Sequence, residues 1–165
     1  MSKFKELYNR FPQELRDKLA ACKQHPKYHK EGPVSEHIKL VFEYAEKNFP
    51  EDMEILLSAL FHDLGKPETF SERVVNGELK ISAYGHEFRA KNFILKHFDL
   101  FKDISTNQEK VEEICHNHMR ASQYNKGTLK KAHKRKAFEE LKHFDAIMKF
   151  AECDKAGKKA PEKVI

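Results

Sequence analysis

The stretch with the clearest chemical potential is ALFHDLGKP, residues 59–67, where His62 and Asp63 end an apolar segment that begins at Ile55. A buried carboxylate without a partner costs several kcal/mol, so a carboxylate in such a segment must be hydrogen-bonded or bound to a cation. We interpret the pair as metal ligands. Lys66, one helical turn after Asp63, could bind a phosphate oxygen beside them; the alternative is a solvated cation at a helix C-terminus.

Helical spacing selects further candidates from the ten histidines of the chain. Residues at i, i+3, i+4 and i+7 share one face of a helix. His37 lies on the apolar stripe of the helix expected at 34–48. His86 begins another such stripe, and Asp154 closes a third. These side chains should therefore point inward.

The segment ICHNHM contains two histidines that one helix cannot aim at the same point. His118 shares a face with Val111 and Ile114, whereas His116 lies roughly 160° around the helix. We favour His118 as the inward group and keep His116 as the alternative.

The remaining histidines are weaker candidates. His25, His29 and His133 stand in polar surroundings and are expected on the surface. His97 and His143 could face the core, either as ligands or as histidines bonded to a backbone carbonyl.

Six inward groups result, and all but the first are expected near a helix end: His37, His62, Asp63, His86, His118 and Asp154. Any one of them could be a core polar residue with a hydrogen-bond partner, but the six together favour a metal site. Imidazole and carboxylate ligands suit Zn, Fe, Mn, Co or Ni.

Helices must carry these groups, because the apolar period is helical along most of the chain. We expect helices at 3–23 (one or two), 34–48, 51–63, 86–98, 107–118, 129–142 and 144–155. Asn76-Gly77, flanked by β-branched residues, predicts a small β-hairpin near 73–82. The predicted fold is all-α, a single domain over 1–165 with about six to seven helices, a core at 34–157 and a frayed tail at 156–165.

Composition narrows the class of protein. With 39% apolar residues and a net charge of +5, the chain is globular and leans modestly toward anionic partners. No apolar run reaches the roughly 20 residues of a membrane span, and the N-terminus has no signal-peptide core. Three cysteines without CxxC spacing predict reduced thiols. We expect a cytoplasmic protein.

The order of these residues resembles the HD-domain superfamily of metal-dependent phosphohydrolases. FHDLGKPETF, the hairpin, YGHE and NHM look most similar to the HD domain of bacterial tRNA nucleotidyltransferases, the CCA-adding enzymes. The resemblance implies an all-helical fold and one or two divalent ions. It assigns His37, His62, Asp63 and Asp154 to one metal and His86 and His118 to a second, bridged by Asp63. The 165 residues contain no nucleotidyltransferase segment, so nucleotide addition is not expected.

The function implied is hydrolysis of a nucleotide or RNA-end phosphate, such as a 2′,3′-cyclic phosphate, by a metal-activated water. Asp63 and Lys66 would be the catalytic residues. A mononuclear variant, with His86 or His118 binding phosphate, remains open. So do a dinucleoside-polyphosphate hydrolase, a non-catalytic nucleic-acid-binding module and a nucleotide sensor.

The stretch 120–136 contains seven lysines and arginines and no acidic residue. It predicts contact with RNA or a polyphosphate, although a solvated helix face would look the same. Arg120, Tyr124 and Lys126 are the substrate-binding candidates here, with Tyr124 placed to stack on a base. Glu87 and Arg120 are candidates for bonding to the metal-ligating histidines.

Overall fold

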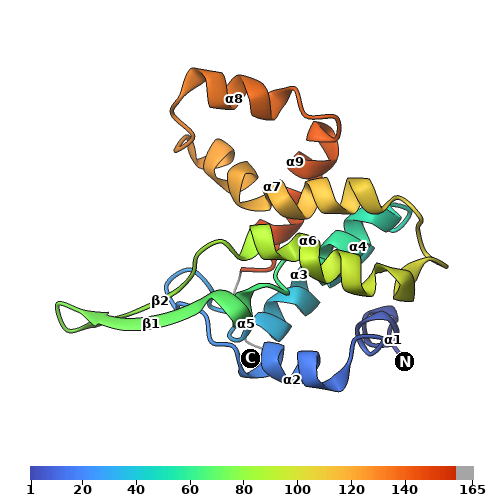
Figure 1. Ribbon diagram of the computed structural model, residues 1–165, viewed down its shortest axis with the longest axis horizontal. Helices are drawn as coiled ribbons and strands as arrows, with labels where there is room; N and C mark the ends of the chain where they lie inside the picture. The colour runs from blue at the N-terminus through green and yellow to red at the C-terminus, as the bar shows by residue number, and fades with distance from the viewer. Residues whose placement is uncertain (159–165) are drawn as a thin grey trace, which may run out of the picture.

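The computed structural model describes residues 1–158, which form a helical bundle with one antiparallel hairpin (Figure 1). Helix α4, Met53–Phe61, is the central element, and every residue from Ile55 to Phe61 is buried. Four other helices pack against α4: α3 (Val34–Asn48), α6 (His86–His97), α7 (Gln108–Lys126) and α9 (Phe144–Ala156). A helix that is apolar all round must be enclosed in this way.

The first two helices cover one end of the bundle. Helix α1, Lys3–Tyr8, and helix α2, Gln13–Ala21, flank Phe11, whose ring makes edge contacts with Phe61 and Phe101. The expected helical segment at 3–23 is thus two short helices.

The hairpin consists of β1, Phe70–Val75, and β2, Glu78–Ala83, and projects from the bundle as an arm (Figure 1). Asn76 and Gly77 both have positive φ, 51° and 77°, as a tight two-residue turn requires. The sequence predicted this element correctly, although it is longer than 73–82. Helix α5, Lys66–Thr69, leads into it.

Helix α7 is longer than the sequence predicted. It continues past His118 to Lys126 and ends at Gly127, which has φ 71° and provides the left-handed C-cap. The expectation that His118 lies near a helix end was therefore wrong, and His37, expected in the interior of its helix, lies in the first turn of α3. No helix breaker precedes Gly127, so the helix has no reason to stop earlier.

Beyond α7 the chain forms a lobe that is completed by helix α8, Ala132–Glu139, which is shorter than the expected 129–142. A 3-10 helix, η1, Phe98–Phe101, follows α6. No helix of the described residues is long and apolar enough to cross a membrane.

The first residues of the expected tail, 156–158, pack against the bundle. Within residues 156–158, Gly157 packs so closely on Val41 that a Cβ there would overlap its side chain. Its carbonyl also accepts a hydrogen bond from His37 Nδ1 at 3.0 Å. The rest of the predicted tail, 159–165, lies outside the described residues.

Candidate metal centre

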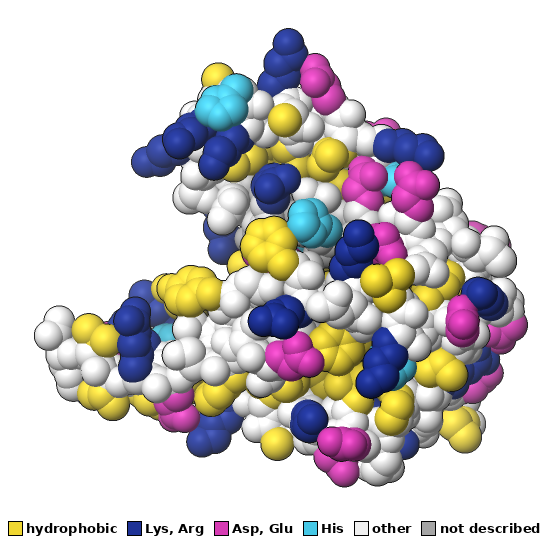
Figure 2. Space-filling model, in the orientation of Figure 1, with side chains coloured by type: hydrophobic (Ala, Val, Ile, Leu, Met, Phe, Trp, Pro, Cys, Tyr) yellow, Lys and Arg dark blue, Asp and Glu magenta, His cyan; other side chains and the backbone are white. Residues whose placement is uncertain are grey.

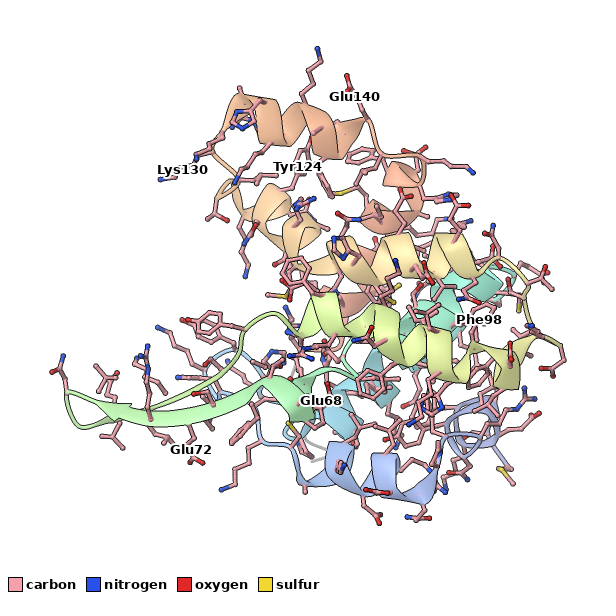
Figure 3. The ribbon with its side chains drawn as sticks, viewed as in Figure 1. Glu68, Glu72, Phe98, Tyr124, Lys130 and Glu140 are labelled. Atoms are coloured by element: carbon pink, nitrogen blue, oxygen red, sulfur yellow. The ribbon has the colours of Figure 1, made fainter. Side chains whose placement is uncertain are left out.

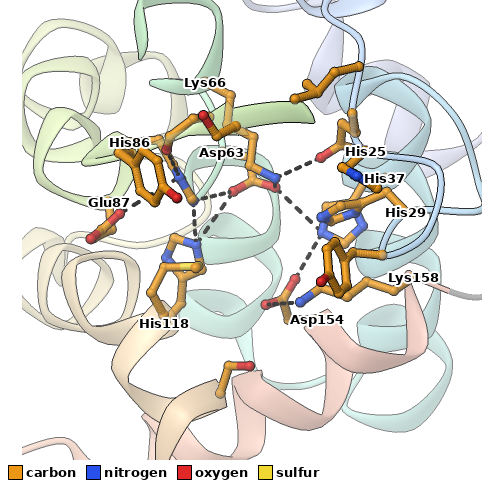
Figure 4. A pocket seen from close by; sticks show the side chains of 18 of the residues that line it. His25, His29, His37, Asp63, Lys66, His86, Glu87, His118, Asp154 and Lys158 are labelled. Atoms are coloured by element: carbon orange, nitrogen blue, oxygen red, sulfur yellow. Dashed lines mark hydrogen bonds and ion pairs between the residues drawn. The ribbon is translucent and has the colours of Figure 1, made fainter. Parts of the chain in front are cut away.

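The structure brings the six predicted ligands together from five parts of the fold, and Figure 4 labels all of them except His62. They come from the start of α3, the turn after α4, the start of α6, the middle of α7 and the end of α9. All six are buried: His37, His62, Asp63, His86, His118 and Asp154. Residues up to 117 positions apart in sequence thus meet at one point.

The four imidazoles are oriented by backbone carbonyls. His62, His86 and His118 each bond through Nδ1 to the carbonyl three residues earlier, at 2.9, 2.8 and 2.6 Å, and His37 bonds to Gly157. A carbonyl can only accept, so Nδ1 carries the hydrogen. Each neutral ring therefore presents a lone pair at Nε2 to the centre of the cluster.

The first group of donor atoms surrounds one point. His37 Nε2 lies 2.8 Å from Asp154 Oδ1 and 3.4 Å from His62 Nε2. Asp63 Oδ2 lies 3.2 Å from His62 Nε2 and 3.5 Å from His37 Nε2. Donors that bind a common ion at about 2.0–2.2 Å are themselves separated by roughly 3–3.5 Å, so this spacing fits a metal.

The second group uses the other oxygen of Asp63. Asp63 Oδ1 lies 3.1 Å from His86 Nε2 and 3.5 Å from His118 Nε2, and these two nitrogens are only 3.0 Å apart. Oδ1 is buried without a hydrogen-bond partner among the described residues. Three converging lone-pair atoms repel one another unless a cation lies between them. The chemistry of this donor set therefore fits a second ion, with Asp63 shared by both groups.

The electrostatics also favour positive charge at this point. Burial alone would raise the pKa of Asp63, but the charges of His62 and Lys66 outweigh it and hold the pKa well below its usual range. Burial likewise opposes the charged form of His62, yet Asp63 and Asp154 raise the pKa of His62 to about 10. Without a metal, a proton on His62 would supply the charge that a divalent ion supplies when bound.

Lys66 lies beside the cluster. Its ammonium group donates to Gln24 Oε1 at 2.6 Å and is 3.2 Å from Asp63 Oδ2. An ammonium group has three N–H donors, so one remains for a ligand in the adjacent cavity.

Gly65, which follows the His-Asp pair, is not needed for its backbone conformation. Its φ is −79°, which any residue adopts. Glycine is required instead because a Cβ would lie 2.6 Å from the carbonyl oxygen of His86 and 2.7 Å from Arg89 Cβ. Pro67 lies in the first turn of α5.

Two residues of the loop between α2 and α3 were missed by sequence reasoning. Glu31 Oε1 lies 2.9 Å from His37 Nδ1 and 2.8 Å from His29 Nδ1. Although burial opposes its ionisation, hydrogen bonds from these two rings lower the pKa of Glu31 to about 2. The prediction that His29 is a surface residue was wrong, because it is half-buried and lines the cavity. The loop has no periodicity that could have indicated either residue.

A cavity of about 380 Å³ opens from the cluster. Its walls include the loop 22–29, the end of β2 and one face of α7, and several basic side chains surround it: Lys23, His25, Lys66, Lys126 and Lys158. The loop 22–29 precedes the first predicted ligand, His37, whereas the other two walls adjoin His86 and His118 in the sequence.

Of the substrate-binding candidates on α7, only Lys126 lines the cavity. Lys126 is eight residues after His118 and lies on a similar face, whereas Arg120 and Tyr124 lie on others. Arg120 is exposed and donates to Asn117, and the Tyr124 hydroxyl bonds to Glu139 at 3.0 Å. Tyr124 packs on aromatic rings of the lobe, so it is not placed to stack on a base in the cavity.

The other open assignments are settled by position. His116 is exposed and makes an edge contact with the ring of Phe88, so His118 is the inward histidine. His97 packs between aromatic rings, and His143 lies near Glu109 and Glu113, outside the cluster. Glu87 Oε2 is 3.7 Å from His86 Nδ1, farther than the carbonyl that orients this ring.

Comparison with protein families matches residues 34–153 to the HD domain. The chain therefore belongs to the HD-domain family, whose members are generally metal-dependent hydrolases. A search of the curated proteins found no match. The matched segment contains all the predicted ligands except Asp154, the next residue along the chain, whereas Glu31, Gln24 and the first two helices precede it.

Proposed function

We propose that this protein is a metal-dependent phosphohydrolase that acts on a nucleotide or RNA-end phosphate, including a 2′,3′-cyclic phosphate. The observation that carries the proposal is the arrangement of Asp63, whose two oxygens each face a separate pair of imidazole lone pairs. Such a shared carboxylate is what two neighbouring ions require.

Bound divalent ions would supply Lewis-acid chemistry, lowering the pKa of water and stabilising charge on a phosphoryl group. The residues of the chain supply the rest. The carbonyl bonds at Nδ1 hold the four rings in their ligating orientation. Lys66, fixed by Gln24 and Asp63, directs its remaining N–H at a phosphate oxygen in the cavity.

The cavity favours an anionic substrate of nucleotide size. Its volume of about 380 Å³ lies in the range of small-molecule sites. Lys23 and Lys126 stand around it, and Lys158 Nζ lies 3.9 Å from Asp154 Oδ2 at its edge. The side chains of Ser122 and Gln123 line it and make no hydrogen bond within residues 1–158, so they are available to a sugar or base.

The three cysteines are free and buried, which supports the proposal of a reducing, cytoplasmic location: Cys22, Cys115 and Cys153.

The experiment is metal analysis combined with a hydrolysis screen. The purified protein is loaded in turn with Mn, Fe, Co, Ni or Zn and assayed on 2′,3′-cyclic mononucleotides, nucleoside mono- and triphosphates and dinucleoside polyphosphates. We expect two ions per chain and turnover of at least one substrate. Asp63→Ala should lose both ions, whereas the matched control Asp99→Ala, an exposed carboxylate, should lose neither.

Counting the ions bound by the His86→Ala variant distinguishes the mononuclear alternative from a two-ion site. If the wild-type protein binds one ion and the variant still binds one, His86 and His118 contact the substrate instead. A protein that binds no ion and hydrolyses nothing under any of these conditions contradicts the proposal.

A further inference from the structure

A notch separates the hairpin from the lobe formed by α7 and α8, as Figure 2 shows. The cavity meets this notch at its inner end, because Tyr84 and Gly85 line one side of it and Gln123 and Lys126 the other. Two arms thus extend outward from the proposed hydrolytic site, farther than a mononucleotide inside the cavity could reach.

The hairpin arm presents like charges to the notch. Arg73 and Lys80 are directly opposite each other in the β1–β2 register. Glu72 projects from the underside of the hairpin, away from the notch (Figure 3), and successive residues of a strand alternate faces, so Arg73 and Lys80 face the notch. Lys80 is paired with Glu78 at 3.0 Å, whereas Arg73 has no ion-pair partner within residues 1–158. Opposed like charges destabilise a hairpin, which an anionic ligand would offset.

The other arm is basic along the end that faces outward. Between residues 120 and 136 there is no acidic residue, and the lysines of this stretch are all exposed: Lys126, Lys130, Lys131, Lys134 and Lys136. Figure 3 places Lys130 on the side of the lobe toward which the hairpin extends, and Glu140 at the opposite end of α8. Arg135 instead donates to the carbonyls of Leu129 and Lys130, so it braces the turn.

Exposed aromatic groups lie between the arms. Tyr84 is 82% exposed and Phe88 56% exposed, and the ring of His116 contacts Phe88 at a centroid distance of 5.1 Å. Figure 2 shows hydrophobic side chains and a histidine at the inner end of the notch. Flat exposed rings next to basic side chains are the arrangement on which nucleic-acid bases stack.

We propose that the notch binds a single-stranded nucleic acid, whose terminal phosphate enters the metal cluster. The inference rests on the proposed phosphohydrolase function and specifies its substrate class as a chain end. Lys130, Lys131 and Lys134 contact the backbone on one side and the Arg73–Lys80 pair on the other, and Tyr84 and Phe88 stack on the bases nearest the end. An acidic protein would satisfy the charges but would leave the aromatic surface without partners.

The test is binding of fluorescent single-stranded RNA and DNA of about twelve nucleotides, within the usual range of site sizes. Affinity is measured by anisotropy from about 50 to 200 mM salt. The triple variant Lys130→Gln, Lys131→Gln, Lys134→Gln should reduce the slope of log affinity against log salt by about 2, since each single-strand phosphate contact contributes about 0.7. Tyr84→Ala should weaken binding about tenfold at every salt concentration, as expected for one lost stacking partner.

The matched control is Lys3→Gln, Lys5→Gln, Lys18→Gln, which removes the same charge from α1 and α2 at the opposite end of the molecule (Figure 1). It should leave the slope unchanged. Equal loss in both triple variants, or competition by polyglutamate as strong as by the oligonucleotide, would overturn the proposal.

Hydrolysis assays distinguish a failure of the notch proposal from a failure of the phosphohydrolase proposal. A chain end should be hydrolysed with a higher kcat/KM than the corresponding mononucleotide, and the triple variant at Lys130, Lys131 and Lys134 should abolish that difference. If mononucleotides are hydrolysed equally well and the variant changes nothing, the notch proposal fails while the phosphohydrolase stands. If the protein binds oligonucleotides with the expected salt slope but hydrolyses no phosphate and binds no ion, the phosphohydrolase fails while the binding surface stands.

Discussion

Gly65→Ala tests whether the close approach of Gly65 to the start of α6 determines the position of His86 in the second group of ligands. A Cβ at position 65 would lie 2.6 Å from the carbonyl oxygen of His86 and 2.7 Å from Arg89 Cβ, whereas ordinary contact begins at 3.4 Å. The start of α6 must therefore retreat by about 0.8 Å. Metal–ligand distances tolerate only about 0.2 Å, so His86 would move out of coordination range of an ion held by Asp63.

The expected loss of stability follows from the same steric overlap. Overpacking a rigid contact costs about 1–3 kcal/mol, and alanine at this φ returns about 0.4–1 kcal/mol by restricting the unfolded chain. A net loss of about 1–2 kcal/mol lowers Tm by roughly 2–8 °C in a chain of this size. Loss of the His86 ligand should weaken the second ion by at least about 10–100-fold, since even indirect supports of a ligand are worth that much.

The assay is the number of ions per chain after dialysis, together with a metal titration and a thermal melt. Wild-type protein should retain two ions and Gly65→Ala one. Gly77→Ala is the control: nothing lies within 4 Å of its Cβ, and its φ of +77° makes alanine strained there, so it should lose stability without losing an ion. Two tightly bound ions and an unchanged Tm in Gly65→Ala would refute the reasoning.

Four further substitutions have defined outcomes. Gly157→Ala places a Cβ against Val41 and 3.3 Å from a carbon of the His37 ring, so titration should show weaker binding of the first ion. Glu31→Gln weakens the hydrogen bond to Nδ1 of the same ring. It should reduce metal affinity about 10–100-fold, measured by competition with a chelator. Lys66→Met should lower kcat/KM about 10²–10³-fold with the ion count unchanged, because it removes a charge that contacts the phosphate. Tyr8→Phe removes a buried hydroxyl without a partner in the described chain, which should raise the unfolding free energy by about 1 kcal/mol. Burial raises the pKa of this tyrosine to about 12, so wild-type stability should fall as the pH rises from about 10 to 12, and the phenylalanine variant should not show that loss.

The candidate metal ligands could be predicted from the sequence because each lies on a helix, or directly after one, whose apolar stripe fixes its direction. His37, His86 and His118 each share a face with residues that must be buried, and helical geometry then aims them inward whatever the partners are. Asn76-Gly77 predicted the hairpin for a similar local reason, since few residue pairs adopt positive φ at two successive positions. The helical fold class followed from the same periodicity.

The positions of loop residues and the directions of polar side chains depended on the tertiary structure. Glu31 is in an aperiodic loop, and only the packing of that loop on α3 places its carboxylate against His37. In the sequence, Arg120, Tyr124 and Lys126 are equally plausible substrate-binding residues of the basic stretch. Because α7 continues to Lys126, only Lys126 lines the cavity. Local periodicity specifies which face of a helix is buried. The contacts of loops and the reach of polar side chains depend on how the helices pack, which is determined by residues far apart in the chain.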